Sequence, residues 1–141
     1  MEEDPREFAV TLHVCVTCRR GEEPLEPREE RSGNKMRLAL SEALRRESPG
    51  APGVRLVPVE CLSGCKRGCT VALSAPAKWS YVIADLDPQQ HAHDVLNFAK
   101  QYSAHPEGVP TWRDRPEIIK RSVLARVPPL PQPPLAREEA A

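Results

Sequence analysis

Five cysteines in two tight groups constrain this chain more than any other feature of its sequence. Cys15 and Cys18 form a Cys-x2-Cys pair, and Cys61, Cys65 and Cys69 follow together after residues 19–60. An odd number of thiols cannot pair completely into disulfides, and two such groups are typical of metal ligands that converge from two segments. We therefore expect a fold that brings the two groups together.

Composition narrows the class of protein further. The chain has 141 residues, the length of one domain, and only 4% are aromatic, so its core must consist mainly of Val, Leu, Ile and Ala. Twenty Lys and Arg residues balance twenty Asp and Glu residues. This balance argues against nucleic acid and against a charged membrane surface as partners.

The sequence shows neither a membrane-spanning stretch nor a secretory signal, and this bears on the expected cellular compartment. No apolar stretch is long enough to cross a bilayer, and the segment Met1-Glu2-Glu3-Asp4 is acidic, unlike a secretory signal. We therefore expect a cytoplasmic protein. In that reducing compartment cysteines serve as metal ligands or redox thiols more often than as structural disulfides.

The first half of the chain predicts a strand, a helix and a second strand. Residues 8–16 alternate between apolar and mixed side chains, the period of a half-buried strand. A helix should begin near Ser32 or Asn34, with Met36, Leu40 and Leu44 on its apolar face, and end at residues 48–50. Residues 54–59 are a short β-branched run that predicts the second strand.

The second half predicts a hairpin and two helices. Residues 70–73 and 79–86 read as strands around a turn at Pro76. A helix should follow with Asp87 as N-cap, Pro88 in its first position and Gln90 closing a capping box. Residues 116–126 predict a third, basic helix in which Ile119, Val123 and Val127 lie in line with the apolar face.

These elements predict an α/β fold with a small mixed sheet flanked by helices. The strand–helix–strand unit requires a parallel crossover and the later hairpin an antiparallel pair. We expect residues 1–7 to form an acidic tail, 8–127 a single metal-binding domain and 128–141 a proline-rich disordered tail.

Both cysteine groups follow predicted strands, so neighbouring strand ends could bring the sulfurs close together. Gly64 and Gly68 allow close approach of the backbone, and their amides could donate hydrogen bonds to sulfur. Lys66 and Arg67 would offset the charge of a thiolate site and could mark a docking face for an acidic partner, or they could be two solvated loop charges.

Several segments together resemble a known family. They are the segment from Val59 to Cys65 (Val-Glu-Cys-Leu-Ser-Gly-Cys), then Val71-Ala72-Leu73, Trp79-Ser80-Tyr81-Val82 and Asp85-Leu86, followed by a helix. The pattern resembles the thioredoxin-like 2Fe-2S ferredoxins, which include the small cluster-bearing subunit of NADH dehydrogenase. With Cys-Val-Thr-Cys-Arg near the start and Trp112-Arg113-Asp114-Arg115-Pro116-Glu117 near the end, residues 10–130 also resemble a bacterial family of predicted metal-binding proteins of that fold.

The resemblance implies a thioredoxin-like fold and a 2Fe-2S cluster on Cys15, Cys18, Cys61 and Cys65. It also implies one-electron transfer to a partner redox or metal-handling protein. Two departures stand out: the family spaces its first two ligands by more than two residues, and Cys69 stands where its members have an apolar residue or proline. Cys69 would therefore be a spare or substitute ligand. The sequence leaves a homodimer open.

Two other interpretations use the same thiols. Zinc is the main alternative cofactor, because four thiolates also make a structural tetrahedral site in an interaction module or metal carrier. A thioredoxin-type dithiol at Cys15 and Cys18 would need a helix N-terminus beside it, and the predicted helix begins more than a dozen residues later.

No set of residues indicates catalysis. The sequence has no glycine-rich phosphate loop and no Ser-His-Asp order, so we do not expect an enzyme. His91 and His93 would point to opposite sides of their predicted helix and could not share a metal, while His13 lies on the same strand face as Cys15.

Overall fold

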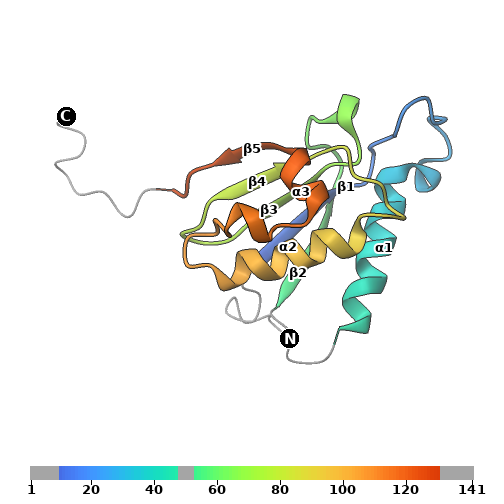
Figure 1. Cartoon of the computed structure of the whole chain (residues 1–141). Helices are drawn as coiled ribbons and strands as arrows, with labels where there is room; N and C mark the ends of the chain where they lie inside the picture. The colour runs from blue at the N-terminus through green and yellow to red at the C-terminus, as the bar shows by residue number, and fades with distance from the viewer. Residues whose placement is uncertain (1–9, 48–52, 131–141) are drawn as a thin grey trace, which may run out of the picture.

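A five-stranded mixed sheet forms the centre of the protein. The computed structural model describes residues 10–47 and 53–130, so the predicted 1–7 tail and residues 131–141 lie outside the described part (Figure 1). The strands stand in the order β2-β1-β3-β4-β5. Their bounds are β1 Val10–Cys15, β2 Val54–Val59, β3 Val71–Ser74, β4 Ser80–Ile83 and β5 Val123–Val127.

The predicted mixed sheet is confirmed. β1 pairs with β2 in parallel, with Val10 opposite Val54 and Cys15 opposite Val59. All other neighbouring strands are antiparallel. Because β1 and β2 run in the same direction, their carboxyl ends meet at one end of the sheet, which is where both cysteine groups begin.

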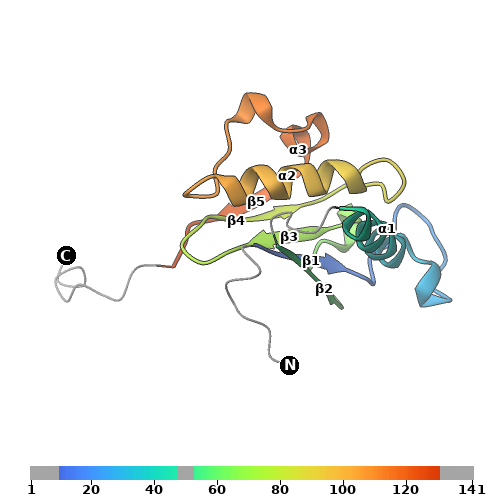
Figure 2. The same cartoon turned by 90° about the horizontal axis from the view of Figure 1, so that it is seen from below.

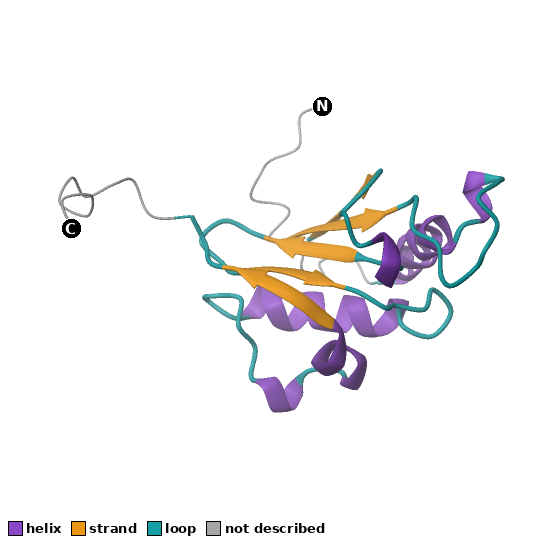
Figure 3. Ribbon diagram, turned by 90° about the horizontal axis from the view of Figure 1, so that it is seen from above, coloured by secondary structure: helices purple, strands orange, loops and turns teal. Residues whose placement is uncertain are grey.

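Helices cover one face of this sheet. α1 (Ser32–Arg46) packs against β1 and against α2 (Ala92–Ala104), and α2 in turn contacts α3 (Glu117–Ser122). Figures 2 and 3 show α2 and α3 lying along the same side of β3, β4 and β5. The alternation of β1 places Val10, Leu12 and Val14 in the buried layer beneath these helices.

Aromatic side chains are few, yet they concentrate in the core. Tyr81, Phe98 and Tyr102 are fully buried, and Tyr81 meets the other two rings edge to face at centroid distances of 5.3 and 5.8 Å. The Tyr81 hydroxyl donates to the Gly108 carbonyl over 2.8 Å. This cluster joins β4 to α2 and stabilises the half of the sheet that lies away from β2.

The predicted start of α2 at Asp87 is wrong. α2 begins at Ala92, with His91 in the N-cap position and residues 88–90 in a turn. Asp87 does cap, but it caps that turn: its Oδ1 accepts from the amides of Gln89 and Gln90 at 2.8 and 3.1 Å. The same residue types satisfy amides in turns and at helix starts, so the sequence could not separate the two.

The Asp87 carboxylate should stabilise the fold in a pH-dependent way. Burial raises its pKa, but the amides of Gln89 and Gln90 and the charge of Arg20 outweigh burial and hold the pKa below its ordinary value of 3.8. Its contribution is therefore present above that value and disappears as pH falls through the lowered pKa. We expect Asp87→Asn to cost roughly 1–2 kcal/mol in urea unfolding at about pH 7. The difference from wild type should shrink at about pH 2, and an equal difference at both pH values would contradict this role.

The predicted third helix is wrong in its second half. α3 ends at Ser122, and the chain continues as β5, which pairs with β4 through Ser80 opposite Val127 and Val82 opposite Ala125. The predicted strand 79–86 is also too long, since β4 ends at Ile83 before Asp85 adopts a φ of 57°.

None of the helices in the described part of the chain has the length and the apolar composition that a membrane-spanning helix needs.

Candidate metal centre

The two cysteine groups lie on loops that are hydrogen bonded to each other. We name residues 15–20 the first cysteine loop and residues 60–70 the second cysteine loop. The amide of Cys15 donates to the Thr70 carbonyl over 3.1 Å and joins the two loops, and the amide of Val16 donates over 2.9 Å to the carbonyl of Val59, the last residue of β2, directly before the second cysteine loop. Figure 1 shows both loops at the same end of the sheet, where β1 and β2 end. The predicted meeting of the two groups is thus observed in the backbone.

Glycines make this approach possible at two points. A Cβ at Gly68 would lie 2.7 Å from the Arg19 carbonyl oxygen and 2.9 Å from Cβ of Cys18. A Cβ at Gly33, in the first turn of α1, would lie 2.2 Å from the Cys15 carbonyl oxygen. The first cysteine loop is therefore held between the start of α1 and the second cysteine loop, with no room for a larger residue at either contact.

α1 begins directly beside Cys18 although it is distant in sequence. The Gly33 amide donates to the Cys18 carbonyl over 2.9 Å. Residues 19–31 form an excursion that ends in a short turn of 3-10 helix, Arg28–Glu30, before α1 starts. The sequence separation led us to expect no helix N-terminus beside the Cys-x2-Cys pair. That expectation is wrong, because the N-terminus of α1 lies against the pair.

Cys15 and Cys18 are buried and in contact. Burial raises the pKa of the Cys15 thiol, but hydrogen bonds from the Cys18 and Thr17 side chains and from the Leu62 backbone outweigh burial and lower it below its ordinary value. Burial and the hydrogen bond to Cys15 raise the pKa of Cys18 to about 12. The two thiols therefore interact directly, and their pKa values are shifted in opposite directions.

Cys61 and Cys65 are exposed on the second cysteine loop. The amide of Ser63 donates to Sγ of Cys61 over 3.2 Å. This is the kind of amide contact expected from Gly64 and Gly68, but Ser63 provides it. Cys65 opens a short turn of 3-10 helix, Cys65–Arg67. Neither thiol is packed into the core, so both side chains are free to turn towards a metal.

Cys69 differs from the other four cysteines because it belongs to the core. It is fully buried, and its amide and carbonyl both pair with Leu86 over 3.1 Å. Burial, and then the charge of Cys18, raise the pKa of Cys69 to about 12. Cys15 and Cys18 are just as buried, but only Cys69 is part of the hydrophobic core cluster, which favours the prediction that Cys69 is a spare residue.

The thiols themselves do not form a complete site in this structure. Within residues 10–47 and 53–130, no three Cys, His, Asp or Glu side chains lie close enough together to hold a metal ion. The donor set nevertheless fits a metal that prefers sulfur, because five thiols lie on two touching loops. A complete site requires the exposed Cys61 and Cys65 side chains to turn inward.

Ion pairs surround these loops. The guanidinium of Arg67 forms an ion pair with the Asp85 carboxylate. Arg20 pairs with Asp87 at 2.6 Å, and Arg28 pairs with Glu60 at 3.8 Å. Lys66 is exposed beside Cys65. Of the two predicted docking charges, Arg67 has an acidic partner in its own chain, whereas Lys66 has none within residues 10–47 and 53–130.

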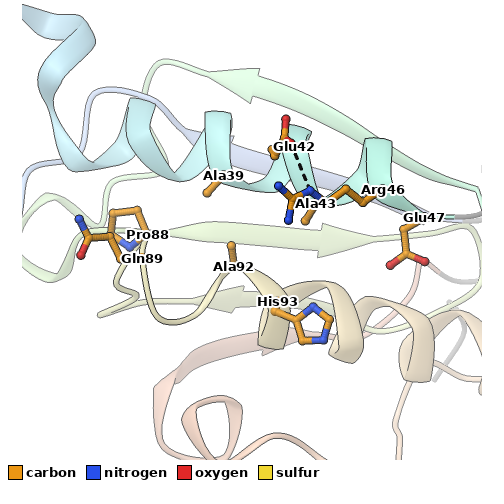
Figure 4. Close-up of a pocket in the computed structure, with 9 residues that line it drawn as sticks. All are labelled: Ala39, Glu42, Ala43, Arg46, Glu47, Pro88, Gln89, Ala92 and His93. Atoms are coloured by element: carbon orange, nitrogen blue, oxygen red, sulfur yellow. Dashed lines mark hydrogen bonds and ion pairs between the residues drawn. The ribbon is translucent and has the colours of Figure 1, made fainter.

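A hollow between helices lies away from the cysteines. It measures about 610 Å³ and is bordered by α1 and the start of α2. Figure 4 shows Ala39, Ala43 and Ala92 on its walls, with the Glu42–Arg46 ion pair and His93 at its edge. His91 is at the N-cap of α2, where its Nδ1 accepts from the Asp87 amide over 2.8 Å, so the predicted place of His91 within the helix is wrong, whereas His93 does lie in α2.

Three polar contacts at the loops could not be found from the sequence. Thr17 donates from Oγ1 to the Glu60 carbonyl. Thr70 is fully buried beside Cys18, and the Gly33 amide donates from α1 to the Cys18 carbonyl. Each contact joins residues that are far apart in the chain, and a single threonine or glycine carries no periodic signal.

Comparison with known proteins identifies a family and a similar fold. A family model described as "Protein of unknown function (DUF1636)" matches residues 12–129. The chain is similar to a thioredoxin-like [2Fe-2S] ferredoxin from Aquifex aeolicus, with 18% identity, a TM-score of 0.54 and coverage of 85% of this chain and 93% of that one. A second structure, of the wild-type ferredoxin of that kind from Aquifex aeolicus, gives 18% identity, a TM-score of 0.51 and coverage of 84% and 98%.

No curated protein matches the chain. Identity at this level establishes the fold alone, and the fold is thioredoxin-like, as the family resemblance implied.

Proposed function

The chain belongs to the family described as protein of unknown function DUF1636, and we propose that it binds a 2Fe-2S cluster through Cys15, Cys18, Cys61 and Cys65 and carries single electrons to a partner protein. The observation that carries this proposal is the contact between two cysteine loops at one end of the sheet. The similar fold of the Aquifex aeolicus ferredoxins supports the choice of cluster.

The donor set supports an iron–sulfur or zinc site over a site for a harder cation. Thiolates are soft ligands and favour zinc and iron–sulfur clusters, whereas magnesium and calcium favour oxygen. When bound, a 2Fe-2S cluster accepts or releases one electron without a change in the protein's covalent structure. No other group of the chain then needs to react.

Each part of the two loops has a role in holding such a group. The first cysteine loop presents Cys15, which is buried and hydrogen bonded to the Thr17 side chain and the Leu62 backbone. The second cysteine loop presents two thiols at the surface. The exposed side of such a site lies within reach of a partner protein, and its buried side excludes water. This arrangement suits electron transfer over a short distance between two proteins.

Metal analysis of anaerobically purified protein tests the proposal. We expect about two iron and two sulfide ions per chain, the composition of a 2Fe-2S cluster. A zinc site on the same thiols is the second candidate, because four thiolates also complete a tetrahedral site. One zinc ion per chain without iron would replace our proposal by this candidate. A metal-free protein that forms a Cys15–Cys18 disulfide would favour thiol–disulfide chemistry instead.

Removing Cys69 distinguishes a spare thiol from a ligand. We expect Cys69→Ala to retain the wild-type iron content, because the residue is paired with Leu86 in the core and is not needed for a four-thiolate site. The variant should lose about 1 kcal/mol in unfolding experiments through the small cavity. Loss of iron from Cys69→Ala, with the fold intact by circular dichroism, would show that our choice of four ligands is wrong.

A further inference from the structure

Thr70, the last residue of the second cysteine loop, contacts both the first cysteine loop and another residue of its own loop. It is fully buried and stands between Cys69 and the first residue of β3. Its carbonyl accepts from the Cys15 amide over 3.1 Å, and its Oγ1 lies 3.7 Å from Sγ of Cys18. The same hydroxyl donates to the Gly64 carbonyl over 3.4 Å. Thr70 therefore contacts Cys15 through its carbonyl, and through its hydroxyl it contacts both the Cys18 sulfur and Gly64, the residue that precedes Cys65.

The presence of a buried threonine hydroxyl at position 70, where valine would fit, calls for an explanation. Burying a hydroxyl is unfavourable unless it is hydrogen bonded, and a valine has nearly the same shape. The space is also tight, since a Cβ at Gly64 would lie 2.7 Å from Oγ1 of Thr70. The hydroxyl is thus fixed in place between two partners, a sulfur and a carbonyl oxygen.

The hydroxyl carries one proton and has two neighbours that can accept it. While Cys18 is a thiol, its S–H donates to Oγ1 of Thr70, and the hydroxyl donates onward to Gly64. A metal-bound Cys18 is a thiolate, which has no proton to donate and is a strong acceptor. The hydroxyl can then turn from the Gly64 carbonyl to the sulfur.

Turning the hydroxyl leaves no buried acceptor without a donor. The Gly64 carbonyl also accepts from the Arg67 amide over 2.8 Å, which closes the short turn that begins at Cys65. Gly64 therefore keeps a hydrogen bond after Thr70 leaves it. The exchange replaces a long bond of 3.4 Å to a neutral carbonyl by a charge-assisted bond to sulfur.

We propose that Thr70 is a positioning residue of the metal centre. When a metal is bound, its hydroxyl donates a hydrogen bond to the Cys18 thiolate and holds the sulfur in place. This inference rests on the proposed function, because it requires Cys18 to be a ligand. It adds a partner for the buried thiolate side of the site, and it couples the ligand state of Cys18 to the loop that carries Cys65. Hydrogen bonds of this kind orient ligands and tune their electron density.

Cobalt binding tests the role of Thr70 without any need for a cluster. Co²⁺ alone is titrated into reduced, metal-free wild type, Thr70→Val and Thr70→Ser, and the thiolate-to-metal absorption band is followed. We expect Thr70→Val to bind roughly tenfold more weakly and to shift this band, since the sulfur loses a hydrogen bond. Thr70→Ser should restore both the wavelength and most of the affinity, which a purely steric role for the methyl group would not allow.

Thr11→Val is the matched control, since it removes a threonine hydroxyl from the opposite end of the sheet. It should bind Co²⁺ as wild type does. If Thr70→Val matches wild type in affinity and wavelength, Thr70 does not position Cys18, although the metal site stands. If wild type itself gives no thiolate band, both the metal site and the role of Thr70 are wrong.

Discussion

Cys65→Ala should lose nearly all of its iron while keeping its fold. Cys65 is exposed and contributes nothing to the core. The stability of the metal-free variant should therefore differ from that of metal-free wild type by less than about 0.5 kcal/mol. A thiolate site that loses one of four ligands keeps little affinity, so we expect the iron content to fall to less than about a tenth of wild type.

The comparison of Cys65→Ala with Cys69→Ala distinguishes the loss of a ligand from the loss of any thiol in the second cysteine loop. Both variants remove one thiol from the second cysteine loop, but Cys65 is at the surface and Cys69 is in the core. The account predicts opposite results: loss of iron with unchanged stability for Cys65→Ala, and retention of iron with reduced stability for Cys69→Ala. Iron retained by Cys65→Ala would remove Cys65 from the ligand set.

Gly33→Ala should have the largest effect on the fold. The added methyl group would lie 2.2 Å from the Cys15 carbonyl oxygen and 2.9 Å from the Cys18 amide nitrogen. These are backbone atoms, so α1 or the first cysteine loop must move, and the hydrogen bond from Gly33 to Cys18 is lost. We expect a loss of about 3 kcal/mol in urea unfolding, together with weaker metal binding.

Gly21→Ala provides the control for this variant. Gly21 has a φ of 59°, and a Cβ there meets no atom within 4 Å. Its replacement should cost about 1 kcal/mol through backbone strain alone and leave metal binding unchanged. Equal effects of the two substitutions would mean that contact between α1 and the cysteine loop has no special importance.

The sequence predicted the layout of the site because that layout depends on local patterns. Two cysteine groups, each after a strand and separated by one crossover, must meet at the carboxyl ends of parallel strands. The alternation before Cys15 and the β-branched run before Cys61 were sufficient for this. The glycines between the cysteines indicated a close approach, and Gly68 does touch the first cysteine loop.

The errors arise where one pattern suits two structures. Val123 and Val127 continue the helical spacing of Ile119, but they are also β-branched, and pairing with β4 decides in favour of a strand. Asp87 satisfies amides in a turn and not in the helix. The contacts of Gly33 and Thr70 with the cysteines depend on packing between distant segments, which no local pattern records.

A reductive titration under anaerobic conditions tests the central claim most directly. Anaerobically purified protein is titrated with dithionite while its visible absorption is followed. The account predicts a coloured protein that takes up about one electron per chain as its absorption bleaches, as a 2Fe-2S cluster does. A colourless protein that takes up no electrons, or one that takes up two electrons per chain at a Cys15–Cys18 disulfide, would contradict it.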